Sequence, residues 1–230
     1  MTLRPINNSC HSNAGILKKI PALFFILLLL VSVTKAADLY WIGGSGNWSD
    51  LNHWSLSSGN AGESLSPSIP QSGDHVIFDI NAGFTPNSKT VIINQTSVCN
   101  TITVAGSTVS PVFDGGVLEI KGSAYYQTGT ALNNQIYFTS SANGNLIAFN
   151  DGVTGTANFY FNGSGSWLVS GSLVNTGRIY FTKGSLDFGS SNITSGIFAE
   201  SGCCGCVPFS MSEPRSLILG TSTISLISIN

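Results

Sequence analysis

Charged side chains are scarce in this chain. Asp, Glu, Lys and Arg make up only 9% of the 230 residues, with eleven acidic and nine basic side chains. Four of the basic residues precede position 37, and the other five are widely scattered: Lys89, Lys121, Arg178, Lys183 and Arg215. No stretch gathers enough positive charge to neutralise a row of phosphates, so we expect no nucleic-acid partner. The same scarcity argues against an anionic membrane surface as a partner.

The sequence also lacks the motifs of several enzyme classes. It contains no recognisable Ser-His-Asp order, phosphate-binding loop or dinucleotide fingerprint, and the Gly-Gly-Ser-Gly run at 43–46 precedes no helical segment. The two well-spaced ligand pairs that a zinc site needs are missing. No segment shows a sustained helical period. Short runs of Val, Ile, Leu, Phe and Tyr, separated by Gly, Asn and Ser, instead predict an all-β protein.

An apolar run near the start predicts a secretory signal peptide over residues 1–36. Residues 22–33 are almost entirely apolar, follow Lys18 and Lys19, and precede small residues that end at Ala36. The run is shorter than the ~20 residues of a membrane-spanning helix. We therefore expect cleavage near Ala36, no transmembrane anchor in the mature chain, and a secreted, extracellular or cell-surface location. Removal of this segment leaves five basic and eleven acidic residues, a net charge of −6.

Three aromatic stretches recur in the second half of the chain. They are Ile-Tyr-Phe at 136–138, Phe-Tyr-Phe at 159–161 and Ile-Tyr-Phe at 179–181, and they start 23 and then 20 residues apart. A second strand pattern follows each copy at a short offset. No single copy could bury its own apolar side, so the repeat predicts stacked coils over residues 75–230, as in a right-handed parallel β-helix.

The apolar pattern predicts twelve strands, and within the aromatic repeats it predicts packing between coils. The predicted strands are His75–Phe78, Thr90–Asn94, Thr101–Ala105, Val117–Lys121, Gln135–Thr139, Asn145–Phe149, Asn158–Phe161, Trp167–Ser170, Arg178–Thr182, Ser185–Phe188, Ser216–Leu219 and Thr223–Ile229. The side chains expected to stack or pack between coils are Tyr137, Phe138, Phe159, Phe161, Ile179 and Phe181. Without the register, the sequence leaves the direction of each side chain open.

An antiparallel β-sandwich is the alternative fold. Its strands also recur every 8–12 residues or so. The dipeptides Asp114-Gly115 and Asp151-Gly152 fit two-residue hairpin turns and favour this alternative. The repeating unit contains more than one strand, however, and this favours the parallel helix.

Three of the four tryptophans lie close together before the first coil, in a segment over residues 37–74. Trp41, Trp48 and Trp54 predict an aromatic cap that covers the open first coil. The other interpretation is a ligand site on which sugar rings stack, with hydrogen bonds from nearby polar side chains. Those polar side chains are Asn47, Asp50 and Asn52.

The opening segment carries a family resemblance. Residues 41–50 read Trp-Ile-Gly-Gly-Ser-Gly-Asn-Trp-Ser-Asp, residues 53–54 read His-Trp, and residues 70–79 read Pro-Gln-Ser-Gly-Asp-His-Val-Ile-Phe-Asp. This combination resembles the amino-terminal module of large, secreted, repeat-rich adhesin-like surface proteins of gliding bacteria that use type IX secretion. The resemblance covers about residues 39–226 and implies a β-helical fold and a non-catalytic role as adhesin or stalk.

Two features depart from that family. Its members are far longer and end in a sorting domain, whereas this chain stops at Asn230 within an apolar strand pattern, which predicts a truncated carboxyl end. A cysteine-rich insertion at 201–208 also interrupts the repeat. Outside the cell, the cysteines Cys99, Cys203, Cys204 and Cys206 are disulfide candidates, and we expect a partly disulfide-bonded loop.

One cluster of ionisable groups could in principle carry acid–base chemistry. Asp74, His75 and Asp79 combine two carboxyls with an imidazole, as hydrolases of polysaccharides require. Strand alternation, however, places His75 and Asp79 on one face and Asp74 at a turn. We therefore expect a structural role for these residues and no catalytic residues.

Calcium is the metal that the sequence most readily suggests, through Asp79, Asn81, Asp114 and Asp151 in glycine-rich turns. The Asp-x-Asp-x-Asp series and the Gly-Gly-x-Gly-x-Asp repeat are both missing. We therefore expect these residues to be ordinary turn formers and the protein to have no cofactor.

These observations predict a secreted, non-enzymatic structural or adhesin-like module of the cell surface or extracellular space, with glycans or other cell-surface components as possible partners. The alternative is a carbohydrate-binding module that uses Trp48 and Trp54, or a polysaccharide-degrading β-helix domain. Glycan binding or turnover distinguishes the two.

Overall fold

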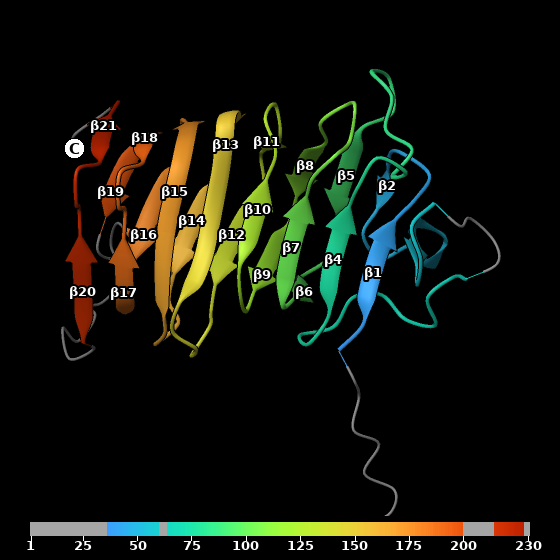
Figure 1. Ribbon diagram of the computed structural model, residues 1–230, viewed down its shortest axis with the longest axis horizontal. Helices are drawn as coiled ribbons and strands as arrows, with labels where there is room; N and C mark the ends of the chain where they lie inside the picture. The colour runs from blue at the N-terminus through green and yellow to red at the C-terminus, as the bar shows by residue number, and fades with distance from the viewer. Residues whose placement is uncertain (1–35, 60–63, 200–213, 228–230) are drawn as a thin grey trace, which may run out of the picture. The chain divides into compact units, whose positions relative to one another are not determined.

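The computed structural model describes residues 36–59, 64–199 and 214–227 as a right-handed parallel β-helix of about six turns. The strands of successive coils lie side by side in three columns (Figure 1). Most coils contribute one strand to each column before the chain moves on to the next coil, whereas the first and the last described coils have strands in the first two columns only. The prediction of a β-helix is therefore confirmed.

The first column begins at the tryptophan-rich segment and continues to the last described coil. Its strands are β1 (Asp38–Trp41), β4 (His75–Phe78), β7 (Thr101–Val104), β10 (Ala124–Tyr126), the first parts of β13 (Asn145–Gly155) and β15 (Ser166–Asn175), β17 (Gly184–Asp187) and β20 (Arg215–Ile218).

The second column is joined to the first because β13 and β15 run on from one to the other. Its strands are β2 (Gly46–Asn47), β5 (Thr90–Ile93), β8 (Val112–Gly115), β11 (Ala131–Leu132), the last parts of β13 and β15, β18 (Asn192–Ser195) and β21 (Thr223–Leu226). Together with β3 (Trp54–Ser55), these two columns form one 15-stranded sheet. A short 3₁₀ helix, η1 (Leu51–His53), precedes β3.

The third column is a separate 6-stranded sheet, called the third sheet below. Its strands are β6 (Ser97–Cys99), β9 (Val117–Ile120), β12 (Gln135–Phe138), β14 (Asn158–Phe161), β16 (Arg178–Phe181) and β19 (Ile197–Ala199). The aromatic repeats are β12, β14 and β16. They lie in register, with Phe138 opposite Phe161 and Phe161 opposite Phe181.

The core lies between the columns and consists of stacked ladders of like side chains. Most strands alternate buried and less buried residues, as in the pattern of β4, β9 and β14. One ladder on the third sheet carries Ile120, Phe138, Phe161 and Phe181, each at most 4% exposed. Because a parallel ladder puts every apolar residue against its counterpart in the next coil, each coil depends on its neighbours for burial.

The sandwich alternative is wrong for the described part of the chain. Within the three columns the strands pair in parallel, and the antiparallel pairing of named strands there is that of β1 with β3. The two Asp-Gly dipeptides form corners instead of hairpins. Gly115 has φ +100° at the end of β8, and Gly152 has φ +85° where β13 shifts register between Phe149 and Val153. Glycine turns the chain there while the strands on both sides stay parallel.

Candidate functional site

The three amino-terminal tryptophans form one buried cluster. Each is 0% exposed, and the ring of Trp54 packs edge-on against those of Trp41 and Trp48, with centroid distances of 5.1 and 4.8 Å. Phe78 of β4 joins the cluster from the next coil. Stacking of a sugar ring needs an exposed aromatic face, and these three rings have none. Their arrangement therefore leaves no place for a glycan on the indole faces.

The glycine-rich opening motif holds this cluster together. The indole N–H of Trp41 donates to the carbonyl of Gly44 at 2.7 Å, and the imidazole of His53 stacks on Trp41 at 4.6 Å and 6°. The Nδ1 atom of His53 lies 2.6 Å from the carbonyl oxygen of Ile42. A Cβ atom on Gly46 would lie 1.9 Å from Nε2 of His53, so only glycine fits beside this ring. Sequence analysis gave His53 no role here.

The polar residues expected beside the tryptophans have local structural partners. One carboxylate oxygen of Asp50 accepts hydrogen bonds from the backbone N–H of Asn52 at 3.0 Å and from its side-chain amide at 2.9 Å. Asp50 is thereby the N-cap of η1. Asn47 is exposed in β2, which pairs with β5.

Asp74 fastens the beginning of the described chain to the first full coil. Its carboxylate is 8% exposed and accepts hydrogen bonds from the backbone N–H groups of Ala37 at 3.0 Å and Gln71 at 2.8 Å. Asp79 accepts from the N–H of Asn81 at 2.8 Å, in a turn at the other end of β4. With ~3.3 Å per residue, the two backbone positions are about 16 Å apart. The carboxyl pairs of glycoside hydrolases are ≈ 5–9.5 Å apart, so this pair does not form such a site.

The cysteine and calcium candidates are dispersed. Cys99 is a buried thiol, and burial, with a smaller contribution from Asp74, strongly raises its pKa. Cys203, Cys204 and Cys206 lie outside the described residues. Asp114 accepts from the N–H of Gly115 beside it. Nowhere in the described ranges do three or more His, Cys, Asp or Glu side chains gather as metal ligands.

A row of tyrosines runs along the outer surface of the third sheet. Tyr137, Tyr160 and Tyr180 occupy matching positions of β12, β14 and β16, one residue before each inward phenylalanine. Their rings stack at 4.3 Å and 10°, and at 4.7 Å and 14°. We call these three residues the tyrosine ladder. Strand alternation turns them away from the core because their neighbours on both sides point into it. Tyr137 and Tyr160 are partly exposed there, whereas Tyr180 is only 7% exposed.

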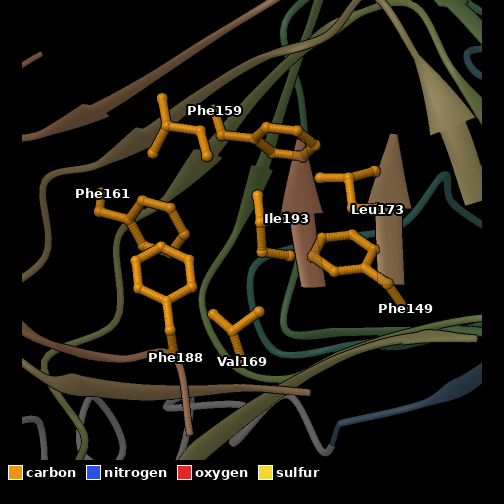
Figure 2. A pocket seen from close by; sticks show the side chains of 8 residues that line it. Phe149, Phe159, Phe161, Val169, Leu173, Phe188 and Ile193 are labelled. Carbon is orange, nitrogen blue, oxygen red and sulfur yellow. The ribbon is translucent and has the colours of Figure 1, made fainter. Parts of the chain in front are cut away.

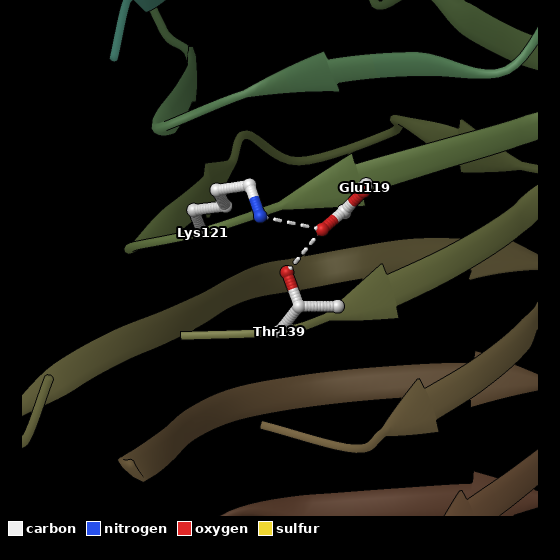
Figure 3. A network of polar contacts seen from close by, with 3 residues as sticks. All are labelled: Glu119, Lys121 and Thr139. Atoms are coloured by element: carbon white, nitrogen blue, oxygen red, sulfur yellow. Dashed lines mark hydrogen bonds and ion pairs between the residues drawn. The ribbon is translucent and has the colours of Figure 1, made fainter. Parts of the chain in front are cut away.

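A charged network precedes the ladder in the next coil toward the amino terminus. Glu119 lies opposite Tyr137 and forms an ion pair with Lys121 at 2.8 Å, and the hydroxyl of Thr139 donates to the same carboxylate oxygen at 2.6 Å (Figure 3). The hydrogen bond from Lys121, and then that from Thr139, lowers the pKa of Glu119. Glu119 is therefore a carboxylate near neutral pH and a poor proton donor.

An amide and a guanidinium lie beside the ladder. The side-chain oxygen of Asn158 accepts from the backbone N–H of Arg178 at 3.0 Å, and Nη1 of Arg178 donates to the hydroxyl of Tyr180 at 3.3 Å. Burial, and then the neighbouring Tyr137 and Tyr180, raise the pKa of Tyr160. The phenol of Tyr160 therefore keeps its proton near neutral pH and can donate a hydrogen bond.

The interior contains a small apolar cavity near the later coils. Figure 2 shows aromatic and aliphatic side chains converging on it from several strands, and its lining residues are Phe149, Phe159, Phe161, Val169, Leu173, Ile179, Phe188 and Ile193. With no polar side chain in the lining, the cavity offers no group to orient a substrate. We interpret it as a local gap in the packing.

The aromatic repeats contain the ladder residues, and Tyr137 was among the side chains expected to stack, while the direction of each side chain was left open. The signal was present: in Ile-Tyr-Phe and Phe-Tyr-Phe the middle residue alone carries a hydroxyl, and strand alternation points it to the face opposite that of its two neighbours.

In the part of the chain that the structure describes, no helix is long and apolar enough to cross a membrane. No family model, curated protein or solved structure matches this chain.

Proposed function

We propose that this chain is a secreted, non-enzymatic structural or adhesin-like module of the cell surface. The observation that carries the proposal is the continuous in-register pairing of coils from β1 to β21 around an apolar core. Coils that each depend on the next form a rod-like array, which suits a spacer or an extended binding surface. The amino-terminal cap suits the same role because it covers one end of the array.

Two features of the sequence support the location. The apolar segment at 22–33, preceded by Lys18 and Lys19, is typical of a secretory leader. The motif at 41–54 resembles surface proteins of the type IX secretion route. The structure gives a physical reason for the glycine at position 46 of that motif, since Gly46 makes room for the ring of His53 against Trp41.

Surface display of the full chain in a gliding bacterium with type IX secretion tests the proposal. We expect a mature species that begins near residue 37 and has left the cytoplasm, and, with a type IX sorting domain fused after residue 230, a species that external protease removes from intact cells. Leu28→Arg places a charge in the leader and should abolish export. Leu51→Arg is the matched control, because Leu51 is 44% exposed and lies outside the leader. Retention of the uncleaved wild-type chain inside the cell would contradict the proposal.

The alternative is a carbohydrate-binding or polysaccharide-degrading β-helix domain. The outward tyrosine ladder, with Lys121 and Arg178 beside it, favours binding over degradation. Degradation by hydrolysis needs a protonated acid and a second carboxylate, whereas Glu119 is held as a carboxylate. Incubation with acidic and neutral polysaccharides, followed by an assay for new reducing or unsaturated ends, tests the degrading alternative.

A further inference from the structure

Charge is distributed unevenly among the faces of the coils. Lys121 follows β9, Arg178 begins β16 and Lys183 follows β16, and Glu119 is the carboxylate on the strands of the third sheet. Acidic residues instead mark the first and second columns, at Asp38, Asp74, Asp79, Asp114, Asp151 and Asp187. Three of the five basic residues after position 36 therefore lie at the ends of third-sheet strands, where Glu119 pairs with Lys121, whereas Lys89 precedes β5 and Arg215 begins β20.

The tyrosine ladder adds a second feature that favours anions. Because each ring covers the face of the next at 4.3 and 4.7 Å, the partly exposed Tyr137 and Tyr160 offer mainly ring edges and hydroxyls to the solvent, while Tyr180 is buried at the end of the stack. An aromatic ring is negative on its face and positive along its edge. A row of edges with phenol donors therefore favours a negatively charged ligand over stacking of a neutral sugar.

The spacing of the row fits a polymer. Adjacent strands lie about 4.8 Å apart, close to the length of one pyranose unit. A polysaccharide that lies along the axis of the coils would therefore place about one sugar on each coil from Tyr137 to Tyr180. Gln135 and Asn158 flank the ladder on the same strands and carry amides that can bond sugar hydroxyls.

We propose that the tyrosine ladder, together with Lys121 and Arg178, binds a linear polysaccharide that carries carboxylates, such as a polyuronate. The inference deepens the proposed function by giving a surface module its ligand class. Arg178 is exposed and the side chain of Lys121 is 40% exposed, so each charge contact with the polymer is weak in water and affinity comes from several coils that bind one polymer together. Salt should weaken the complex because charge attraction at the surface is screened.

Titration calorimetry of the folded chain with polygalacturonate tests the inference, with the methyl-esterified polymer and dextran as neutral probes. We expect binding to polygalacturonate at low salt, weaker binding at high salt, and at least about tenfold weaker binding of either neutral polymer, equivalent to about 1.4 kcal/mol. Equal binding of the charged and esterified polymers would overturn the role of charge.

Variants locate the site. The double variant Lys121→Gln, Arg178→Gln should weaken binding by about tenfold or more, and Tyr160→Leu by a few-fold. The matched controls are Lys89→Gln, before β5, and Tyr125→Leu, on the first column, where the tyrosine is 38% exposed. Circular dichroism should show that every variant keeps its strand content.

The possible outcomes separate this inference from the proposed function. Equal losses in the ladder variants and the controls would overturn the placement of the site. If polygalacturonate does not bind at millimolar concentration of sugar units, the inference fails, while the protease assay on intact cells still decides surface display. Release of unsaturated or reducing ends from the polysaccharide would show that the protein degrades its ligand, and this would contradict the non-enzymatic role.

Discussion

The molecule gathers aromatic side chains in two regions that differ in what they expose. In the amino-terminal cap, Trp41, Trp48 and Trp54 are fully buried and pack edge to face. On the third sheet, Tyr137 and Tyr160 are half-buried and stack in a row on the outside of the coils. The first region closes the core, whereas the second provides a surface. Density of aromatic residues in a sequence therefore does not by itself identify a binding site.

The difference follows from how each region is built. The cap folds back on itself, because β3 pairs antiparallel with β1 and brings Trp54 opposite Trp41. Its rings converge from several directions and exclude water. The third sheet repeats one parallel strand, so alternation sends one residue in and the next one out in every coil.

The largest expected effect is in the cap. Trp54→Ala removes a fully buried ring and the hydrogen bond from its indole to the carbonyl of Trp48. We expect the free energy of unfolding to fall by about 3–5 kcal/mol in chemical denaturation. Leu51→Ala, at an exposed neighbour, should change it by less than about 0.5 kcal/mol. Equal effects of the two substitutions would mean that the tryptophan is not in the core.

The next effect tests the close contact of glycine with histidine. Gly46→Ala places a Cβ atom where the His53 ring now lies, so the ring must leave its stacked position on Trp41. We expect a loss of about 1–3 kcal/mol, again by chemical denaturation. Gly73→Ala is the matched control because its Cβ would meet no atom within 4 Å. A neutral Gly46→Ala would contradict the packing described for the motif.

A smaller effect is expected on the third sheet. Tyr160→Leu removes two ring stacks, each worth about 0.5–1.5 kcal/mol, and we expect a total loss of about 1–2 kcal/mol. Tyr125→Leu, on the first column, should be nearly neutral in the same denaturation assay. If Tyr160→Leu cost as much as Trp54→Ala, the contrast between surface and cap would fail.

The smallest effect concerns pH. Lys121 and Thr139 lower the pKa of Glu119 below its ordinary 4.5, so the native state favours the carboxylate. The resulting stabilisation is present above that value and is lost as pH falls through the lowered pKa. The side chains of Lys121 and Glu119 are 40% and 29% exposed, so solvent screens the pair and the effect is small. We expect the free energy of unfolding of Lys121→Met to fall slightly less than that of the wild type as the pH is lowered into the acid range. An identical pH dependence of the two proteins would show that the ion pair contributes nothing to stability.

The sequence predicted the repeating part of the fold well. The strands at His75–Phe78 and Asn158–Phe161 match β4 and β14, because clear alternation and flanking turn residues mark them. The stacking of the aromatic repeats is confirmed: although the copies start 23 and then 20 residues apart, their like residues lie in register. β1 and β10 are among the strands that were not predicted: β10 is only three residues long, and β1 lies in the segment that was expected to form the cap.

Corners and burial were harder to predict. Asp114-Gly115 has the composition of a hairpin turn, and only the neighbouring coils show that the chain continues in the same direction. The full burial of Trp48 depends on Trp54 and on Phe78 of the next coil, which local pattern does not reveal. The outward direction of Tyr160 was within reach, because the phenylalanines on both sides of it had to be buried.

Direct observation of contacts within the tyrosine ladder tests the account most sharply. In a sample with isotope-labelled tyrosine rings, assigned by single Tyr→Phe variants, NMR should show ring-to-ring cross-relaxation between Tyr137 and Tyr160 and between Tyr160 and Tyr180. Tyr125, on another column, should show no contact with these three. Absence of both ladder contacts in the folded protein would contradict in-register coils and, with them, the proposed binding surface.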